Sequence, residues 1–207
     1  RSARRGRRMT GALIVFARQP RTGDVKTRLA AKIGDVRAAG IYARLLSRTL
    51  RLAEASRFSD RYLFTADRDQ IKYFEDSLAS GRWQVCAQCA GNIGKRMHQA
   101  MDWGLRRHDF IVLIGSDVAD GEVTDLDEAW ETLSHLSTNA VIGPSVDGGY
   151  WLIGLRELQP MIFNNIVWST AEVLRTTVSR LGTIGIEVKC LTPRHDIDEV
   201  EDLQYLA

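Results

Sequence analysis

Two aspartates that each follow a predicted strand are the residues best placed for chemistry in this sequence. Asp117 comes after the apolar run 110–114 and a Gly-Ser turn, and Asp198 comes after the later predicted strand 186–191. Ligands of open α/β sheets bind outside the carboxyl ends of the strands, so carboxylates at such ends can reach a substrate or a metal. Taken alone, Asp117 could equally close a turn or cap a helix. Two carboxylates from distant segments predict one divalent cation, Mg²⁺ or Mn²⁺, with Asp196 as the alternative ligand if the terminal loop is shifted.

A basic loop directly after the first predicted strand is a candidate phosphate-binding site. The segment reads FARQPRTGDVKTRL, in which four cations, Arg18, Arg21, Lys26 and Arg28, surround a turn at Gly23. Cations and the amides at the start of a helix both favour anions. The segment is not a Walker loop, because the earlier glycine is missing and Asp-Val separates Gly23 from Lys26, and it has no G-x-G-x-x-G fingerprint. We prefer phosphate binding to a solvated basic loop, since crowded cations repel one another unless an anion joins them.

Two further loops combine glycines with polar side chains at the ends of predicted strands. The first reads GNIGKRM, in which glycines from Gly91 onward let the backbone approach a ligand, Asn92 can cap the next helix and Arg96 can bind phosphate or base. The second reads DGGYW and offers Asp147 as a carboxylate and Tyr150 as an aromatic surface for a sugar or base ring. An ordinary glycine loop and a tight hairpin turn explain these two patterns equally well.

The positions of these loops follow from the alternation of apolar runs and helical patterns along the chain. A β-α-β-α-β-α-β start implies a mostly parallel sheet with right-handed crossovers and helices on both faces. No repeat or low-complexity stretch interrupts the pattern, so we expect one domain over 11–207 after a basic arm over 1–10. The predicted strands are 12–17, 61–66, 83–87, 110–114, 140–143, 150–155 and 186–191, and the predicted helices are 35–55, 70–78, 95–105, 126–136, 171–181 and a last one from 199.

Length and composition narrow the class of protein. A chain of 207 residues suits one well-buried domain. Its 28 basic residues outnumber the 26 acidic ones only because five arginines crowd into the first eight positions, and such an arm is more often solvated than bound to nucleic acid or membrane. We expect neither a signal peptide nor a membrane span, since no apolar run approaches ~20 residues. With three cysteines and no disulfide framework, we expect a cytoplasmic protein.

Taken together and in this order, the motifs resemble those of a bacterial family of GT-A-like proteins. The matching motifs are the basic loop F-A-R-x-P-x-x-G-x-V-K-T-R-L, the loop G-x-x-G-x-R-M, the strand end G-S-D, the loop P-x-x-D-G-G-Y, W-S-T from Trp168, and H-D-I-D-x-x-E-D-L. Members of this family are described as nucleotide-diphospho-sugar transferases or arsenosugar-pathway glycosyltransferases. The resemblance runs from about Gly11 to Leu203. It implies a Rossmann-like GT-A sheet with one antiparallel strand, which binds a nucleotide with a divalent metal.

The resemblance also implies roles for single residues. Asp117 and Asp198 match the metal-binding positions, and Asp117 and Asp147 are the expected catalytic carboxylates. The expected nucleotide-binding residues are Arg18, Gly23, Lys26, Arg28, Gly91 and Arg96, and those on the acceptor or sugar side are Gly148, Gly149, Tyr150 and Trp168. The chain departs from the family pattern after G-S-D, where Val-Ala-Asp-Gly replaces Cys-Pro-Gly-Leu, and at Asn92, where an aspartate is usual. These departures bear on the shape of the loop after Asp117 and on the selection of the nucleotide.

Three functions remain open from the sequence. The first is glycosyl transfer from a nucleotide-diphospho-sugar to a small acceptor, in which the metal bridges the diphosphate. The second is nucleotidyl transfer from a nucleoside triphosphate, which the crowded cations and the terminal D-I-D-x-x-E-D-L also suit. The third is a non-catalytic nucleotide-binding protein, suggested by the altered loops but disfavoured by the presence of both aspartates. We prefer the first, expect neither nucleic acid nor a membrane as partner, and leave a homodimer through Trp103 and Trp130 open.

Overall fold

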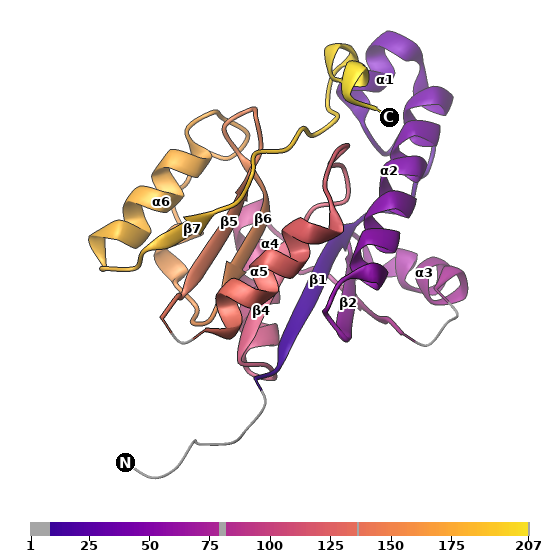
Figure 1. The fold of residues 1–207 in the computed structure, drawn as a ribbon. Coiled ribbons are helices and arrows are strands. Elements are labelled where there is room, and N and C mark those ends of the chain that lie inside the picture. Colours follow the sequence, from indigo (N-terminus) through magenta and orange to yellow (C-terminus); the bar gives the residue numbers. More distant parts are fainter. Residues whose placement is uncertain (1–8, 79–81, 136, 207) are drawn as a thin grey trace.

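The computed structural model describes residues 9–78, 82–135 and 137–206, and within them seven strands form one sheet. The strands are β1 (Gly11–Ala17), β2 (Asp60–Thr65), β3 (Gln84–Ala87), β4 (Phe110–Ile114), β5 (Ala140–Pro144), β6 (Tyr150–Leu155) and β7 (Val188–Cys190). Their order is β3-β2-β1-β4-β6-β5-β7 (Figure 1). Among these strands β6 alone runs antiparallel to its neighbours, which confirms the predicted mostly parallel sheet with one antiparallel strand.

Helices cover both faces of the sheet, as predicted (Figure 1). Helices α2 (Asp35–Ala55) and α5 (Val123–Ser134) pack on one face, and α4 (Ile93–Leu105) and α6 (Val173–Thr183) pack on the other. The shorter helices are α1 (Thr27–Ile33), α3 (Ile71–Ser77), and the 3₁₀ turns η1 (Arg68–Gln70), η2 (Pro160–Ile162) and η3 (Val200–Tyr205). No helix in the described part of the chain is both long and apolar enough to cross a membrane.

The two-sided core explains why the central strands are apolar without interruption. Side chains of a strand point alternately to opposite faces. Leu13 and Val15 of β1 therefore pack with α2 and α5, whereas Ile14 and Phe16 pack with α4 and α6. Every residue of β1 and β4 is buried, as is usual when both faces of a parallel sheet are covered by helices.

The strand order creates a crevice between β1 and β4. The chain leaves β1 for β2 on one side and reaches β4 on the other side, so the connecting segments diverge at the carboxyl ends of β1 and β4. The antiparallel direction of β6 brings its first residues, Tyr150 and Trp151, to the same edge of the sheet. The ends of β1 and β4 and the start of β6 therefore meet at this end of the sheet.

Element boundaries differ from the prediction at the ends of several elements. The basic loop leads into the short helix α1, which the predicted helix ranges lack, and Gly34 separates α1 from α2. Helix α5 ends at Ser134, and the predicted end at Leu136 lies outside the described residues. The terminal helix is a 3₁₀ turn, and β7 is shorter than the predicted strand 186–191. Residues 1–8 of the predicted arm also lie outside the described residues.

The two tryptophans that the sequence left open for a dimer contact pack against this chain's own core. The rings of Trp103 and Tyr62 meet edge to face with their centroids 4.7 Å apart. Trp130 packs edge to face on Phe110 at 6.1 Å. Both indoles are partly buried by these contacts, so neither supports the homodimer, which stays a prediction without structural support.

Candidate active site

A cavity of about 520 Å³ opens at the carboxyl ends of β1 and β4. Its volume lies within the ~300–1,000 Å³ that is usual for small-molecule sites. The charged side chains that line it include four cations and two of the predicted carboxylates: Arg18, Lys26, Arg28, Arg96, Asp117 and Asp198. The cavity therefore brings the basic loop, the start of α4 and both predicted metal ligands to one place.

Asp117 and Asp198 meet on one cation, the ammonium of Lys26. Its Nζ lies 2.8 Å from Oδ2 of Asp117 and 2.8 Å from Oδ1 of Asp198. The Lys26 side chain is only 7% exposed, whereas the two carboxylates are 37% and 48% exposed. Burial alone would lower the pKa of Lys26, but the two carboxylates outweigh it and raise the pKa above its ordinary value. The carboxylates are thus close enough to share an ion, whereas a separation above ~10 Å would have excluded a common site.

Asp196, the alternative ligand, lies beside this acidic pair but is held differently. Its Oδ2 accepts a hydrogen bond from Oγ of Ser145 at 2.7 Å, and its Oδ1 is buried without a hydrogen-bond partner among the described residues. Burial and the nearby Asp117 raise the pKa of Asp196 well above the ordinary range of a carboxyl group. The ion pair that joins the other two carboxylates to Lys26 does not extend to Asp196.

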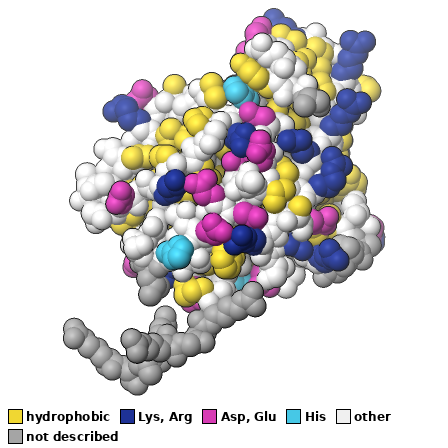
Figure 2. All heavy atoms as spheres, in the orientation of Figure 1, with side chains coloured by type: hydrophobic (Ala, Val, Ile, Leu, Met, Phe, Trp, Pro, Cys, Tyr) yellow, Lys and Arg dark blue, Asp and Glu magenta, His cyan; other side chains and the backbone are white. Residues whose placement is uncertain are grey.

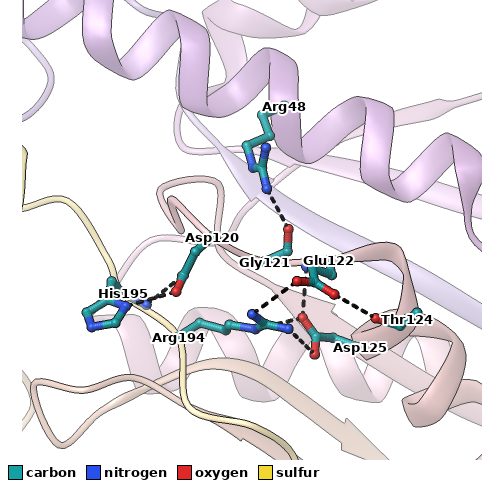
Figure 3. A network of polar contacts seen from close by, with 8 residues as sticks. All are labelled: Arg48, Asp120, Gly121, Glu122, Thr124, Asp125, Arg194 and His195. Carbon is teal, nitrogen blue, oxygen red and sulfur yellow. Dashed lines mark hydrogen bonds and ion pairs between the residues drawn. The ribbon is translucent and has the colours of Figure 1, made fainter. Parts of the chain in front are cut away.

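The loop after β4 and the C-terminal segment 194–198 are joined along their backbones. The amide of Ile197 donates to the carbonyl of Asp117 at 3.1 Å. One carboxylate oxygen of Asp120 accepts the backbone N–H of His195 at 2.8 Å, and the other lies 2.9 Å from Nδ1 of its ring (Figure 3). This pairing places Asp198 beside Asp117 although 80 residues separate them in the chain.

Two arginines extend this network to the neighbouring helices (Figure 3). Nε and Nη2 of Arg194 donate to the two carboxylate oxygens of Asp125 at 3.0 and 2.9 Å, and Asp125 is buried at the start of α5. Nη2 of Arg48 on α2 donates to the carbonyl of Gly121 at 2.9 Å. Asp120 and Gly121 belong to the Val-Ala-Asp-Gly segment that departs from the family pattern, and here they hold the loop in place.

Tyr42 links the basic loop to the strand end that carries Asp117. Its hydroxyl accepts the backbone N–H of Arg18 at 2.9 Å and shares a hydrogen bond with Oγ of Ser116 at 2.8 Å. The helical pattern of α2 indicated a buried face, but it could not show which partner the hydroxyl would find. Tyr42 and the pair Asp120 and His195 are the contributors to the site that sequence reasoning missed.

The basic loop is less crowded with unpaired charge than the sequence suggested. Arg21 pairs with Asp69 at 2.9 Å, and Lys26 pairs with the two aspartates. The argument that these cations repel one another without a bound anion is therefore wrong for two of them, because the protein supplies the anions itself. Arg18 and Arg28 still line the cavity. Basic side chains also gather on the side of the molecule formed by α1 and α2 (Figure 2).

Gly94, in the loop that begins at Gly91, and Gly148 lie where the chain approaches itself closely. A Cβ at Gly94 would lie 2.5 Å from the ring of Trp168, and a Cβ at Gly148 would lie 2.3 Å from the carbonyl of Ala171. The segment 163–171 thus rests on both glycine loops. Asn92 caps α4 as predicted, because its side chain accepts the amide of Lys95 at 2.9 Å.

The acceptor-side residues are only partly gathered at the cavity. Tyr150 lines it, and burial raises the pKa of its hydroxyl. Asp147 is exposed and outside the cavity lining, and its Oδ1 accepts the amide of Gly149 at 2.9 Å within its own turn. Trp168 also lies outside the lining, against α4. In the loop before α4, the carbonyl of Gly91 accepts a hydrogen bond from Nε of Arg96 at 2.9 Å.

The chain belongs to a family described as an uncharacterized protein conserved in bacteria (DUF2064), whose model matches residues 49–170. A crystal structure from Desulfovibrio desulfuricans G20, provisionally named a nucleotide-diphospho-sugar transferase, is 32% identical. It matches with a TM-score of 0.86 over 94% of this chain and 85% of that one. The comparison with curated proteins gave no match. The predicted GT-A-like family and the transferase class are confirmed by these findings.

More distant solved structures share the fold alone. The synthetase of CMP:2-keto-3-deoxy-manno-octonic acid, complexed with CTP, is 9% identical with a TM-score of 0.58 over 94% of this chain and 95% of that one. A manganese complex of Rv0371c from Mycobacterium tuberculosis H37Rv is 18% identical with a TM-score of 0.53 over 97% and 98%. The sheet of this chain is therefore a fold that nucleotide-using transferases share.

Proposed function

We propose that this protein transfers a glycosyl group from a nucleotide-diphospho-sugar to a small acceptor, with a divalent cation held at Asp117 and Asp198. The observation that carries the proposal is the meeting of these two carboxylates in a cavity that arginines also line. Such a cavity offers oxygen ligands for a hard cation beside positive side chains for a diphosphate. The name of the relative from Desulfovibrio desulfuricans G20 agrees with this donor class.

In this proposal the nucleotide diphosphate lies between the basic loop and the start of α4. Arg18, Arg28 and Arg96 provide guanidinium groups on the cavity wall, and guanidinium groups bind phosphate oxygens in pairs of hydrogen bonds. Gly23 and Gly91 shape the two loops that carry these side chains. The hydrogen bonds of Tyr42 to the loop and to Ser116 hold the basic loop against the strand end.

The chemistry of the donor set fits Mg²⁺ or Mn²⁺. Asp117 and Asp198 supply carboxylate oxygens, and no group of three His, Cys, Asp or Glu side chains within the described residues forms a complete metal site. The remaining ligands would be phosphate oxygens and water, so cation and nucleotide bind together. When bound, the cation neutralises the diphosphate and stabilises the leaving nucleoside diphosphate.

The acceptor is proposed to enter from the side of the β5–β6 loop. This loop lies on the far side of β4 from the basic loop, because β6 and β5 follow β4 in the sheet. Asp147 at the rim would orient an acceptor hydroxyl or accept its proton, and Tyr150 would face the sugar. Gly148 and Gly149 form the turn between Asp147 and Tyr150. Trp168, in the segment 163–171, packs against Gly94 at the start of α4.

Nucleotidyl transfer is the second candidate, and a specific observation favours it. Four cationic side chains line the cavity together with Asp24, Asp117 and Asp198, so the lining keeps one net positive charge before a metal binds. A nucleoside triphosphate carries more negative charge than a nucleotide-diphospho-sugar and would contact more of these cations. In that reaction a phosphorylated acceptor attacks the α-phosphate and pyrophosphate leaves.

The released product distinguishes the two reactions. The protein is incubated with Mg²⁺ or Mn²⁺, nucleotide-sugars or nucleoside triphosphates, and pooled sugars and sugar phosphates. Release of nucleoside diphosphate from a nucleotide-sugar supports glycosyl transfer, whereas release of pyrophosphate from a triphosphate supports nucleotidyl transfer. A thermal-shift panel of the same nucleotides, with and without the metal, first identifies the nucleobase that the protein binds. Binding of none of them would overturn both candidates.

We also propose that residues 11–207 form one catalytic domain in the cytoplasm.

A further inference from the structure

We infer that the Lys26 ammonium occupies the site between Asp117 and Asp198, the acidic pair, in the nucleotide-free protein. A divalent cation binds at this site only after nucleotide phosphates have replaced the two carboxylates as partners of the ammonium. This inference rests on the proposed function, because it concerns the same carboxylates and the same nucleotide. It assigns to Lys26 a role in metal binding beyond the phosphate contact predicted from its motif.

The ammonium occupies the position between the two carboxylates. Nζ of Lys26 lies 2.8 Å from one oxygen of each aspartate, and the side chain is almost entirely buried. A metal bound to the same two oxygens would lie about 2.0 to 2.6 Å from each of them, in the space that Nζ fills. Ammonium and metal therefore exclude each other on these oxygens.

Charge leads to the same conclusion. Two carboxylates and one ammonium carry a net charge of one negative unit, which attracts a dication only weakly. A dication and an ammonium ion about 4 Å apart repel each other twice as strongly as two unit charges would at that distance. A divalent cation gains the full attraction of Asp117 and Asp198 only after Lys26 has moved.

The backbone of Lys26, at the start of α1, has an unusual conformation. Its φ is 49° and its ψ is 48°, a left-handed conformation that costs energy for a residue other than glycine. Such conformations persist where surrounding contacts enforce them, and the two ion pairs are contacts of that kind.

A place to receive the ammonium lies on the same cavity wall. Lys26 lines the cavity together with Arg18 and Arg28, where the phosphates of the proposed nucleotide would lie. Transfer of the ammonium from carboxylate to phosphate keeps its positive charge paired throughout. Nucleotide therefore both opens the acidic pair and brings further oxygen ligands for the metal.

Binding of Mn²⁺ to the nucleotide-free protein tests this directly. Free Mn²⁺ is measured by electron paramagnetic resonance in titrations of the wild type, Lys26→Gln, Lys26→Arg and Arg44→Gln. We expect Lys26→Gln to bind Mn²⁺ about tenfold more tightly than the wild type, since it removes a charge at contact distance. Lys26→Arg keeps the charge, and Arg44→Gln removes an exposed charge outside the cavity, so both should resemble the wild type. Adding the nucleotide with the largest thermal shift should restore tight Mn²⁺ binding to the wild type.

The outcomes separate this inference from the proposed function. Equal Mn²⁺ affinity of Lys26→Gln and wild type would overturn the inference, and so would wild-type Mn²⁺ affinity that nucleotide does not change. Asp117→Asn in the Lys26→Gln background should abolish the gain if the ion binds at the acidic pair. If Lys26→Gln does not fold, the nucleotide dependence of the wild type decides alone. Failure to find a glycosyl product affects none of these readings, because they need no turnover.

Discussion

The acidic pair and the β5–β6 loop lie on the same edge of the sheet but are held very differently. Asp117 and Asp198 are fixed by Lys26, by backbone pairing of their two segments and by the network in Figure 3. Asp147 is exposed and is held by a hydrogen bond within its own turn. Groups that bind charged ligands gain from a rigid arrangement because no reorganisation is needed on binding. We therefore propose that the acidic pair serves the donor and that the β5–β6 loop at the rim serves the acceptor.

The largest expected effect comes from the centre of the rigid region. Asp117→Asn keeps the size of the side chain but removes the negative charge that pairs with Lys26 and would bind the metal. Turnover should fall by about 10³-fold or more, in line with the loss of a main electrostatic group in an active site. The measurement is the initial rate at saturating metal and donor, with circular dichroism as the control for folding. Retention of more than a tenth of the activity would remove Asp117 from the site.

The next effect tests the other region. Asp147→Asn should lower turnover by about 10²-fold, which is the lower range for a general base, while nucleotide affinity stays within twofold. Titration calorimetry and initial rates on the same preparation give both numbers. Equal losses of affinity and rate would place Asp147 in the nucleotide site. A fall in melting temperature alone would return it to a purely structural role in the turn.

Nucleotide affinity should respond to the cavity arginines. Arg28→Ala removes a charge-assisted phosphate contact, for which roughly 1.5 to 3 kcal/mol of binding free energy is expected. The matched control is Arg44→Ala, an exposed arginine of α2 outside this cavity. Titration calorimetry with the selected nucleotide checks both variants. Equal affinities for the two variants would show that the basic loop is merely solvated.

The smallest effect concerns the contact that positions the pair. Asp120→Ala removes both hydrogen bonds to His195 and should weaken nucleotide-dependent Mn²⁺ binding by about tenfold, the lower range for residues that orient metal ligands. Asp120→Asn keeps an acceptor for the backbone N–H and should restore most of the affinity. A loss of melting temperature without a change in Mn²⁺ affinity would make the contact structural only.

The sequence predicted the framework because local patterns determine it. The continuous apolar runs of β1 and β4 and the helical period of α2 are visible without tertiary information, and these three elements lie close to their predicted ranges. The place of Asp117 was predictable because it follows β4 directly, at the carboxyl end of a central strand. Asp198 lies beyond the end of β7 and is brought beside Asp117 by the backbone pairing of segment 194–198 with the loop after β4. The pairing of Lys26 with both aspartates was not predictable, since it depends on side chains from three distant segments.

Other features of the site were missed because they also depend on contacts between distant segments. The glycines of the loop 91–94 were predicted to approach a ligand, and Gly148 was predicted on the acceptor or sugar side. The sequence did not show that Gly94 and Gly148 both lie against the segment 163–171 of the same chain. The hydroxyl of Tyr42 and the carboxylate of Asp120 satisfy partners that no spacing rule identifies. Asp147 was predicted from its motif, and the motif alone could not show that the side chain faces solvent at the rim.

The central claim is that Asp117 and Asp198 hold a divalent cation together with the phosphates of a nucleotide. Crystals grown with Mn²⁺ and the nucleotide selected by thermal shift test it most directly, because manganese is located by its anomalous scattering. We predict a single strong peak about 2.0 to 2.6 Å from oxygens of both aspartates and of the nucleotide phosphates, with the ammonium of Lys26 moved onto phosphate. A manganese ion bound elsewhere, or a nucleotide bound outside the cavity while Lys26 still joins the two carboxylates, would contradict the account.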